Sequence, residues 1–212
     1  MNYPIAIHKE SGSDYGVAVP DLPGCFSAGS TIDEAMLPIR YVGYSTSFRR
    51  EAGAAGKDTR GILRQHQFDK LEMETFTRPE DGYREQDLLV AIQEHLVREL
   101  GLHHNVMLVC TGDMGKPDQR QMDINIWMPG QDTFRETHSA DYMGGFQARR
   151  LNTRVKSVEG DLTHVHMNDA TAFAIGRTLI AIMENYQQED GTIRIPPVLV
   201  PYVGKEVIRR SA

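Results

Sequence analysis

The sequence has little of what marks several classes of protein. It contains two cysteines, Cys25 and Cys110, with no CxxC pair and no spaced set of cysteine and histidine ligands. We therefore expect neither a disulfide scaffold nor a structural zinc site. No apolar run reaches the roughly 18 residues of a membrane span, because the best candidate, residues 171–183, carries Arg177 in its middle. The start, MNYPIAIHKESG, lacks the basic and apolar regions of a signal peptide, which predicts a cytoplasmic protein without a membrane partner.

The chain also lacks the excess of basic residues that would hold nucleic acid through bulk electrostatics. Lysine and arginine number 23 against 29 aspartate and glutamate residues, so the formal net charge is −6. A polyanion would have to be met by a local cluster of cations. One is present, because Arg49, Arg50, Lys57, Arg60 and Arg64 lie close together in the sequence.

The chain does contain enough apolar sequence for a sizeable core, with 40% hydrophobic residues. Its first part predicts short strands at residues 3–9, 15–20 and 25–30, separated by turns that contain Gly, Asp and Pro. Thr31 and Glu34 then form a capping box, which indicates the start of a helix that the following residues do not complete.

The rest of the chain predicts an α+β fold with a largely antiparallel sheet, because runs of strands are separated by segregated helices. The predicted strands are residues 38–51, 66–75, 105–111, 122–128, 151–157 and 163–167. The predicted helices are residues 83–100, which end at Gly101, and residues 170–185. A polar stretch follows the predicted strand at residues 122–128 and runs through Arg150.

A glycine-rich stretch, GAAGKDT, follows the first of these strands. Only two residues separate Gly53 from Gly56, and Asp58 follows Lys57 where a phosphate-binding loop has Ser or Thr. The pattern therefore favours a hairpin tip over a phosphate loop.

Just before this tip, Arg49 and Glu51 alternate on a predicted strand and so share a face. An arginine fork suits phosphate, and a glutamate can accept hydrogen bonds from an amine, as nucleotide binding requires. The local pattern alone favours the alternative, a surface ion pair.

Two further pairs of residues have the same two interpretations. Phe68 and Glu72 share parity on the next strand and line a cleft, unless Phe68 belongs to the core. Glu136 and Ser139 could share a magnesium ion that bridges phosphate oxygens, or could lie in a turn.

Histidines and a helical arginine complete the candidates. His164 and His166 share a face of a predicted strand, but no third ligand stands at a recognisable spacing, so a metal site there is disfavoured. Arg177 lies in an apolar helix, TAFAIGRTLIAI, where its burial is costly unless a carboxylate or phosphate meets it.

These segments are similar, in order, to one family. SFRREAGAAGKDTRGILRQHQFDKLEM resembles motif 2 of the class II aminoacyl-tRNA synthetases in its seryl form. LVCTGDMG, WMPGQDTFRETHS, FQARRLNTR and GRTLIAIMENYQQEDGTIRIPPVLVPY resemble the rest of the C-terminal half of that enzyme, including motif 3. The resemblance runs from about residue 37 to residue 209 and implies the mostly antiparallel class II sheet flanked by helices.

The resemblance implies an ATP site. Arg49 would grip the α-phosphate, Glu51 would accept a hydrogen bond from the adenine amino group, and Phe68 would stack on the adenine ring. Arg64 and Arg177 would hold the outer phosphates. Arg49 and Arg177 would then be the catalytic groups.

The resemblance also implies a magnesium site and a serine site. Glu136 and Ser139 would carry magnesium. Glu72 would accept the ammonium group of serine, and Thr171 would contact its side chain. Asp169 stands beside this pocket where the family usually has Asn. The reaction implied is activation of serine as seryl-adenylate and its transfer to tRNA.

Some of the family's features have no counterpart in this sequence. They are the coiled-coil tRNA-binding arm, the motif 1 dimer interface and the Thr-x-Glu serine loop. The resemblance therefore leaves open whether the chain acts as a serine-tRNA ligase, binds tRNA(Ser) or forms an oligomer.

The N-terminal segment, YPIAIHKESGSDYGVAVPDLPGCFSAGSTIDEA, resembles the first strands of HicB-type antitoxins, which cover the active site of HicA-type mRNA-cleaving toxins. We interpret residues 1–36 as an incomplete antitoxin-like module and residues 37–212 as a synthetase-like catalytic core fragment. The alternative functions are serine activation with ATP and binding of a HicA-type toxin. A third hypothesis is that the N-terminal strands complete the synthetase sheet, so that the chain is one domain.

Overall fold

The computed structural model describes residues 6–13, 15–18, 26–29, 37–51, 61–156 and 161–209. Three features of the sequence analysis lie outside these ranges: the capping box that begins at Thr31, the glycine-rich stretch around Gly56, and Cys25.

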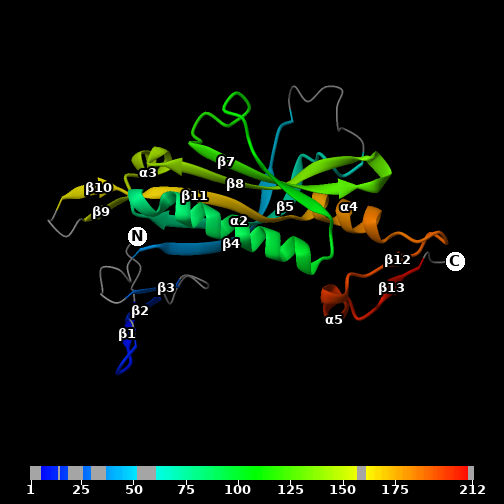
Figure 1. Ribbon diagram of the computed structural model, residues 1–212, viewed down its shortest axis with the longest axis horizontal. Helices are drawn as coiled ribbons and strands as arrows, with labels where there is room; N and C mark the ends of the chain where they lie inside the picture. The colour runs from blue at the N-terminus through cyan, green and yellow to red at the C-terminus, as the bar shows by residue number, and fades with distance from the viewer. Residues whose placement is uncertain are drawn as a thin grey trace.

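Within the described part of the chain, nine strands form one sheet in the order β1-β2-β3-β4-β5-β11-β8-β7-β6 (Figure 1). In chain order they are β1 (Ala6–Lys9), β2 (Tyr15–Ala18), β3 (Phe26–Gly29), β4 (Ile39–Phe48), β5 (Gln67–Thr77), β6 (His104–Leu108), β7 (Arg120–Met128), β8 (Thr133–Gly144) and β11 (His166–Ala174). Their pairings are antiparallel. The predicted α+β class with an antiparallel sheet is confirmed.

Helices and small hairpins surround this sheet. The helices are α2 (Gly82–Glu99), α3 (Phe146–Leu151), α4 (Ile175–Tyr186) and α5 (Val200–Val203), with 3-10 turns η1 (Pro79–Asp81), η2 (Pro129–Gln131) and η3 (Pro197–Leu199). β9 (Arg154–Lys156) pairs with β10 (Leu162–His164), and β12 (Ile193–Arg194) pairs with β13 (Val207–Ile208). Within the described ranges, none of the helices has the length and apolar character that crossing a bilayer demands.

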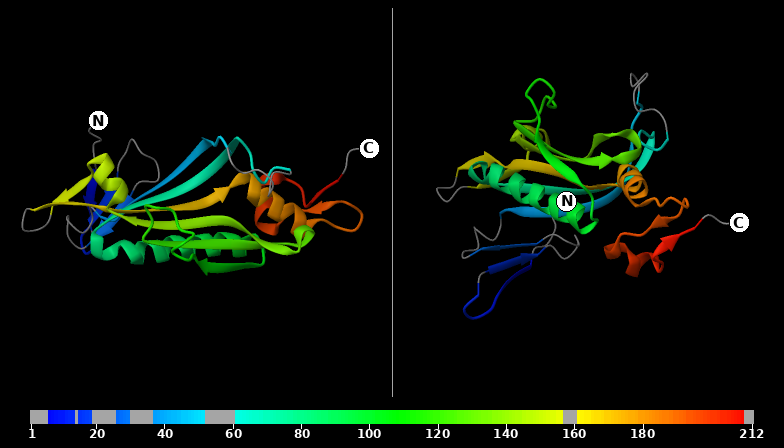
Figure 2. Two further views of the ribbon diagram at one scale, coloured as in Figure 1. Left: turned by 90° about the horizontal axis from the view of Figure 1, so that it is seen from above. Right: turned by 45° about the vertical axis from the view of Figure 1, so that its right-hand side comes forward.

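The long helix α2 covers one face of the sheet (Figures 1 and 2). Its buried Leu89 and Val90 pack with Met73 of β5 and with small residues of β8 and β11. Val97, near its end, packs in a second cluster with Ile124 and Ile126 of β7. The helix stops where predicted, because Gly101 adopts the left-handed φ of +66° that glycine tolerates best.

Two central strands differ from the sequence prediction. The polar stretch that runs through Arg150 contains β8 and most of the short helix α3. Residues 170–174, predicted to begin a helix, form the end of β11, and α4 begins only at Ile175. Small residues such as Ala170 and Ala172 favour helix locally, but here they lie under α2 in the middle of the sheet, and this packing outweighs propensity.

The N-terminal strands β1 to β3 extend the edge of this sheet beyond β4. The described contact between the two parts of the sheet is narrow, because β3 pairs with β4 through Phe26 and Arg40. Arg40 also donates from Nε and Nη2 to both carboxylate oxygens of Glu85, at 2.9 and 2.8 Å, which ties β4 to α2.

Candidate functional site

One cavity of about 460 Å³ lies on the face of the sheet opposite α2. Its lining includes all the residues that the sequence analysis proposed for ATP, magnesium and serine. They are Arg49, Glu51, Arg64, Phe68, Glu72, Glu136, Ser139, Asp169, Thr171 and Arg177. The structure thus brings together side chains that lie up to 128 positions apart in the sequence, although their individual roles stay predictions.

Strand β5 supplies one wall of the cavity. Phe68, Lys70 and Glu72 alternate along it and therefore point to the same side. The Arg49 guanidinium carbon lies 5.5 Å from the centroid of the Phe68 ring. A planar aromatic face with a cation beside it is a suitable place for a stacked, negatively charged ligand.

The segment after β4 carries the next two side chains. β4 ends at Phe48, so the prediction that Arg49 and Glu51 alternate on a strand is wrong. The backbone of Arg49 instead donates to the carbonyl of His66 at 2.9 Å, and Glu51 has a left-handed φ of +50°. Glu51 forms an ion pair with Arg64, at 3.2 Å, and both still line the cavity.

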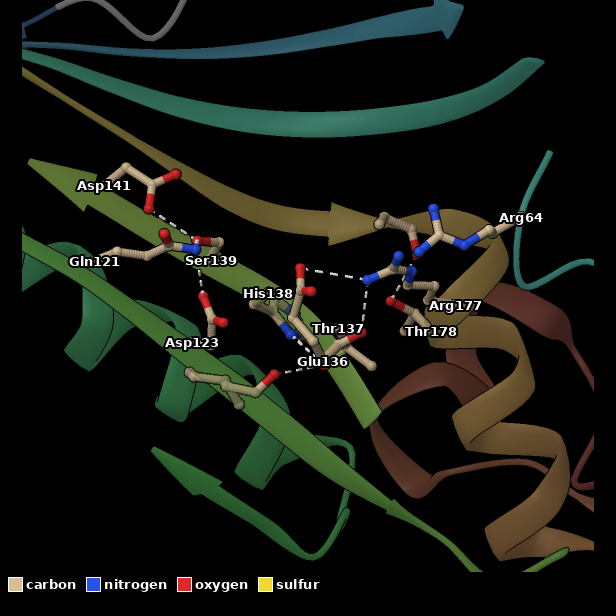
Figure 3. Close-up of polar contacts among 12 residues, drawn as sticks. Arg64, Gln121, Asp123, Glu136, Thr137, His138, Ser139, Asp141, Arg177 and Thr178 are labelled. Atoms are coloured by element: carbon tan, nitrogen blue, oxygen red, sulfur yellow. Dashed lines mark hydrogen bonds and ion pairs between the residues drawn. The ribbon is translucent and has the colours of Figure 1, made fainter. Parts of the chain in front are cut away.

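The opposite wall comes from β8 and the first turn of α4 (Figure 3). Arg177 Nη1 donates to the Glu136 carbonyl at 2.8 Å and lies 3.3 Å from Glu136 Oε1. The carboxylate partner that the sequence analysis required for Arg177 is therefore Glu136. The α4 turn comes close to the segment before β5, because a Cβ on Gly176 would lie 3.2 Å from the Ile62 carbonyl.

A β-bulge explains how Glu136 and Ser139, three positions apart, both line the cavity. The register of β7 with β8 shifts between Ile124 and Asn125, which leaves Thr137 as an extra residue in β8. Ser139 Oγ donates to Asp141 at 2.9 Å. The two predicted ligands therefore lie on a strand, and the alternative of a turn is wrong.

Glu136 and Ser139 offer one carboxylate and one hydroxyl to a metal ion. Within the described ranges no group of three or more His, Cys, Asp or Glu residues could hold a metal by itself. Magnesium commonly keeps several waters and binds through one or two protein oxygens and substrate phosphates. The residues present therefore fit a magnesium ion that arrives with phosphates.

The inner end of the cavity is acidic. Burial, together with Glu74, Asp141 and Glu72, raises the pKa of Asp169 to about 8. Burial also raises the pKa of Asp141 to about 6 and that of Glu74, beside the cavity, to about 7. Lys70 pairs with Glu72. This end of the cavity therefore favours a ligand that brings a positive charge, such as an ammonium group.

Comparison with known proteins places the chain in a family. A model described as "tRNA synthetase class II core domain (G, H, P, S and T)" matches residues 7–186. The chain belongs to the class II aminoacyl-tRNA synthetase core family.

Similar members of the class II family are serine-tRNA ligases. The enzyme of Caldicellulosiruptor bescii is 48% identical over 178 residues, which are 84% of this chain and 42% of that protein. That of Symbiobacterium thermophilum is 50% identical over 179 residues, again 84% and 42% of the two chains. This chain therefore spans less than half the length of these relatives.

Solved structures that resemble this chain are also seryl-tRNA synthetases. Seryl-tRNA synthetase from Pyrococcus horikoshii, complexed with ATP, has a TM-score of 0.80 and 38% identity, covering 97% of this chain and 47% of that one. The cytoplasmic serine-tRNA ligase of Naegleria fowleri, in complex with AMP, has a TM-score of 0.78 and 30% identity, covering 99% and 51%.

The family match begins at residue 7, within the N-terminal segment. Neither this match nor the relatives support an antitoxin-like segment. The boundary at residue 36 stays a prediction.

Sequence reasoning missed several residues that line this cavity, among them the polar residues Lys70, Gln121 and Asp141. Lys70 could have been found, because it shares parity with Phe68 and Glu72. Asp141 could not, because β8 was not predicted as a strand.

The two histidines of the HxH pattern, His164 and His166, do not line the cavity. His164 ends β10 and His166 begins β11, so the prediction that they share one strand is wrong. His166 Nδ1 contacts the Tyr142 hydroxyl.

Proposed function

We propose that the chain binds ATP with magnesium and activates serine as seryl-adenylate, the first step of a serine-tRNA ligase reaction. The observation that carries this proposal is the gathering of all the predicted ATP, magnesium and serine residues around one cavity. The solved relative with ATP and the serine-tRNA ligases among the similar proteins support it.

The nucleotide would lie along β5 and the segment before it. Phe68 offers its ring to adenine, with Arg49 beside it for the α-phosphate. Glu51 accepts a hydrogen bond from the adenine amino group. Its present partner is Arg64, which would turn toward the outer phosphates.

The phosphates would lie between β8 and the start of α4. Arg177 is oriented there by the Glu136 carbonyl and carboxylate. The positive end of α4 points to the same region, because Ala174, Gly176 and Arg177 line the cavity. Magnesium, held by Glu136 and Ser139, would supply charge neutralisation at the phosphate oxygens.

Serine would occupy the acidic end. Its ammonium group faces Glu72, whose pKa burial raises and Lys70 lowers. Thr171, which follows Asp169 on the cavity face of β11, contacts the serine side chain. An ammonium beside these carboxylates would offset the repulsion among them.

The chemistry is attack of a serine carboxylate oxygen on the α-phosphorus, with pyrophosphate leaving. The new bond joins the carboxylate to AMP, and the bond to the β-phosphate breaks. Arg49 and Arg177 stabilise the charge on the transferring and leaving groups, so no protein nucleophile is needed. Transfer of serine to tRNA(Ser) is the second step of the proposed reaction.

The ATP and serine halves of the site can be tested separately by calorimetric titration. We expect Arg177→Ala to weaken binding of ATP and magnesium about tenfold or more, because a charge-assisted contact is lost. Glu72→Ala should leave ATP affinity within about twofold, because it removes a contact to serine only. Serine affinity should fall about tenfold or more in Glu72→Ala and stay within about twofold in Arg177→Ala.

Thermal denaturation and circular dichroism of each variant provide the control for folding. A folded wild-type protein that binds no ATP would refute the proposal. Nothing among the described residues favours toxin binding by the first 36 residues, so we propose no function of that kind.

A further inference from the structure

Two glutamines of α2 are fully buried, although the helix lies on the face of the sheet away from the cavity. Gln86 and Gln93 have 0% exposure and lie two turns apart, on one side of the helix. Each side-chain amide donates to two backbone carbonyls of the sheet. A buried amide is costly without such partners, so both residues fix the helix and strands relative to one another.

Gln93 joins the two strands that carry the opposite halves of the site. Its Nε2 donates to the carbonyls of Ser139 on β8 and Thr171 on β11, each at 2.8 Å. Direct pairing of these strands ends at Ala140 and Ala170. The amide of Gln93 therefore bridges the next position, where the paired residues would be Ser139 and Thr171.

The cavity extends from the directly paired Asp141 and Asp169 past the point where this pairing stops. Ser139 and Thr171 line it, and β11 has a register shift just beyond Thr171 in its pairing with β5. Further along, Arg177 contacts Glu136 across the same opening. The opening between β8 and β11 is thus bounded by Gln93 at its inner end and by the Arg177–Glu136 contact at its outer end.

We propose that Gln93 is a positioning residue, which sets the separation of β8 and β11 and so aligns bound serine with the α-phosphate. The inference rests on the proposed function, in which Ser139 lies on the magnesium side and Thr171 on the serine side. Gln93 itself would touch neither ligand, because it reaches the strands from the α2 side. Reaction between two bound groups requires their atoms to lie about 3–3.5 Å apart, so a small change of strand separation has a large effect.

The test compares Gln93→Met with Gln86→Met. Methionine has a similar length but no amide. Gln93→Met loses two buried hydrogen bonds, and Gln86→Met loses three, because Gln86 Oε1 also accepts from Arg120 Nε. Gln86 is the control because it bonds the carbonyls of Arg120 and Ala140 from the same side of α2, where β7, β8 and β11 pair directly. Gln86→Met should lower the melting temperature at least as much as Gln93→Met, because it also removes the acceptor of Arg120 Nε.

The first measurement is hydrogen–deuterium exchange without ligand. We expect Gln93→Met to increase exchange in residues 133–139 and 171–174, and Gln86→Met to leave these segments unchanged relative to the rest of the sheet. Equal exchange of these segments in both variants would overturn the proposed positioning. Because no ligand is present, this result does not depend on the proposed function.

The second measurement is binding of ATP with magnesium and of a non-hydrolysable sulfamoyl analogue of seryl-adenylate, which fills both halves of the site. Gln93→Met should weaken binding of the analogue about tenfold or more but keep ATP affinity within about twofold. Only the analogue fills both halves of the site, so only its affinity depends on the separation of β8 and β11. Gln86→Met should change neither. Equal losses for both ligands, or for both variants, would show a purely structural role. A wild-type protein that binds neither ligand would instead refute the proposed function.

Discussion

Asp169 shows how one buried side chain makes the site sensitive to pH. Its carboxyl lies among Glu72, Glu74 and Asp141, and burial followed by this repulsion raises its pKa to about 8. An unfolded aspartate titrates near 3.8. The folded protein therefore binds this proton more tightly than the unfolded chain, so the carboxyl destabilises the fold when it is charged.

Asp169→Asn should remove this effect. As the pH rises through about 8, we expect the wild-type protein to lose stability, and as the pH falls from 8 toward 4 it should regain it. The asparagine variant should be more stable than the wild type at pH 9, on the order of 2 kcal/mol, with a flatter dependence on pH. Urea unfolding at pH 6 and pH 9 measures both quantities. If the free energy of unfolding changed equally between pH 6 and pH 9 in the two proteins, the raised pKa of Asp169 would be contradicted.

At the scale of elements, β8 and β11 determine what the sequence could and could not predict. Regular amphipathic elements such as α2 and β7 were predicted with small errors at their ends. β8 was missed because one of its faces lines a polar cavity and its bulge at Thr137 interrupts the alternation of apolar residues. The site residues were identified through family resemblance, because parity along one strand cannot show which strands are neighbours.

The β8 bulge also buries a neutral histidine. His138 is 1% exposed, and its Nδ1 lies 2.7 Å from Thr137 Oγ1. Burial lowers its pKa from 6.5 to about 4. Since the unfolded chain then takes up this proton more readily, stability should fall as the pH drops from 6.5 to 4.

His138→Gln keeps a polar side chain in the bulge without a group that titrates in this range. We expect the wild-type protein to lose roughly 2 kcal/mol more than the variant between pH 6.5 and pH 4. The pH dependence of stability that His138 contributes is opposite in sign to that of Asp169. Comparison of the double variant, His138→Gln with Asp169→Asn, with each single variant therefore separates the two contributions. Parallel stability profiles for wild type and His138→Gln would contradict a buried, neutral His138.

At the scale of the whole molecule, one sheet carries all the predicted site residues around one cavity, within a chain that spans about half the length of the serine-tRNA ligases that it matches. The cavity is lined by residues from Arg49 onward, which come from the segment between β4 and β5 and from β5, β7, β8, β11 and α4. The described N-terminal strands meet this region through one residue pair, Phe26 and Arg40. We therefore propose that residues 37–209 carry out serine activation and that the described N-terminal strands have no direct contact with the ligands.

The most direct test of this account is serine-dependent exchange of pyrophosphate into ATP by the purified chain. Exchange occurs only when seryl-adenylate forms reversibly, so it reports bond formation at the α-phosphorus. We predict exchange that requires serine and magnesium and that falls about a hundredfold or more in Arg177→Ala and in Glu72→Ala, because each removes a charge placed at the reacting groups. A folded protein that binds ATP and serine but shows no exchange would contradict the claim that this cavity activates serine.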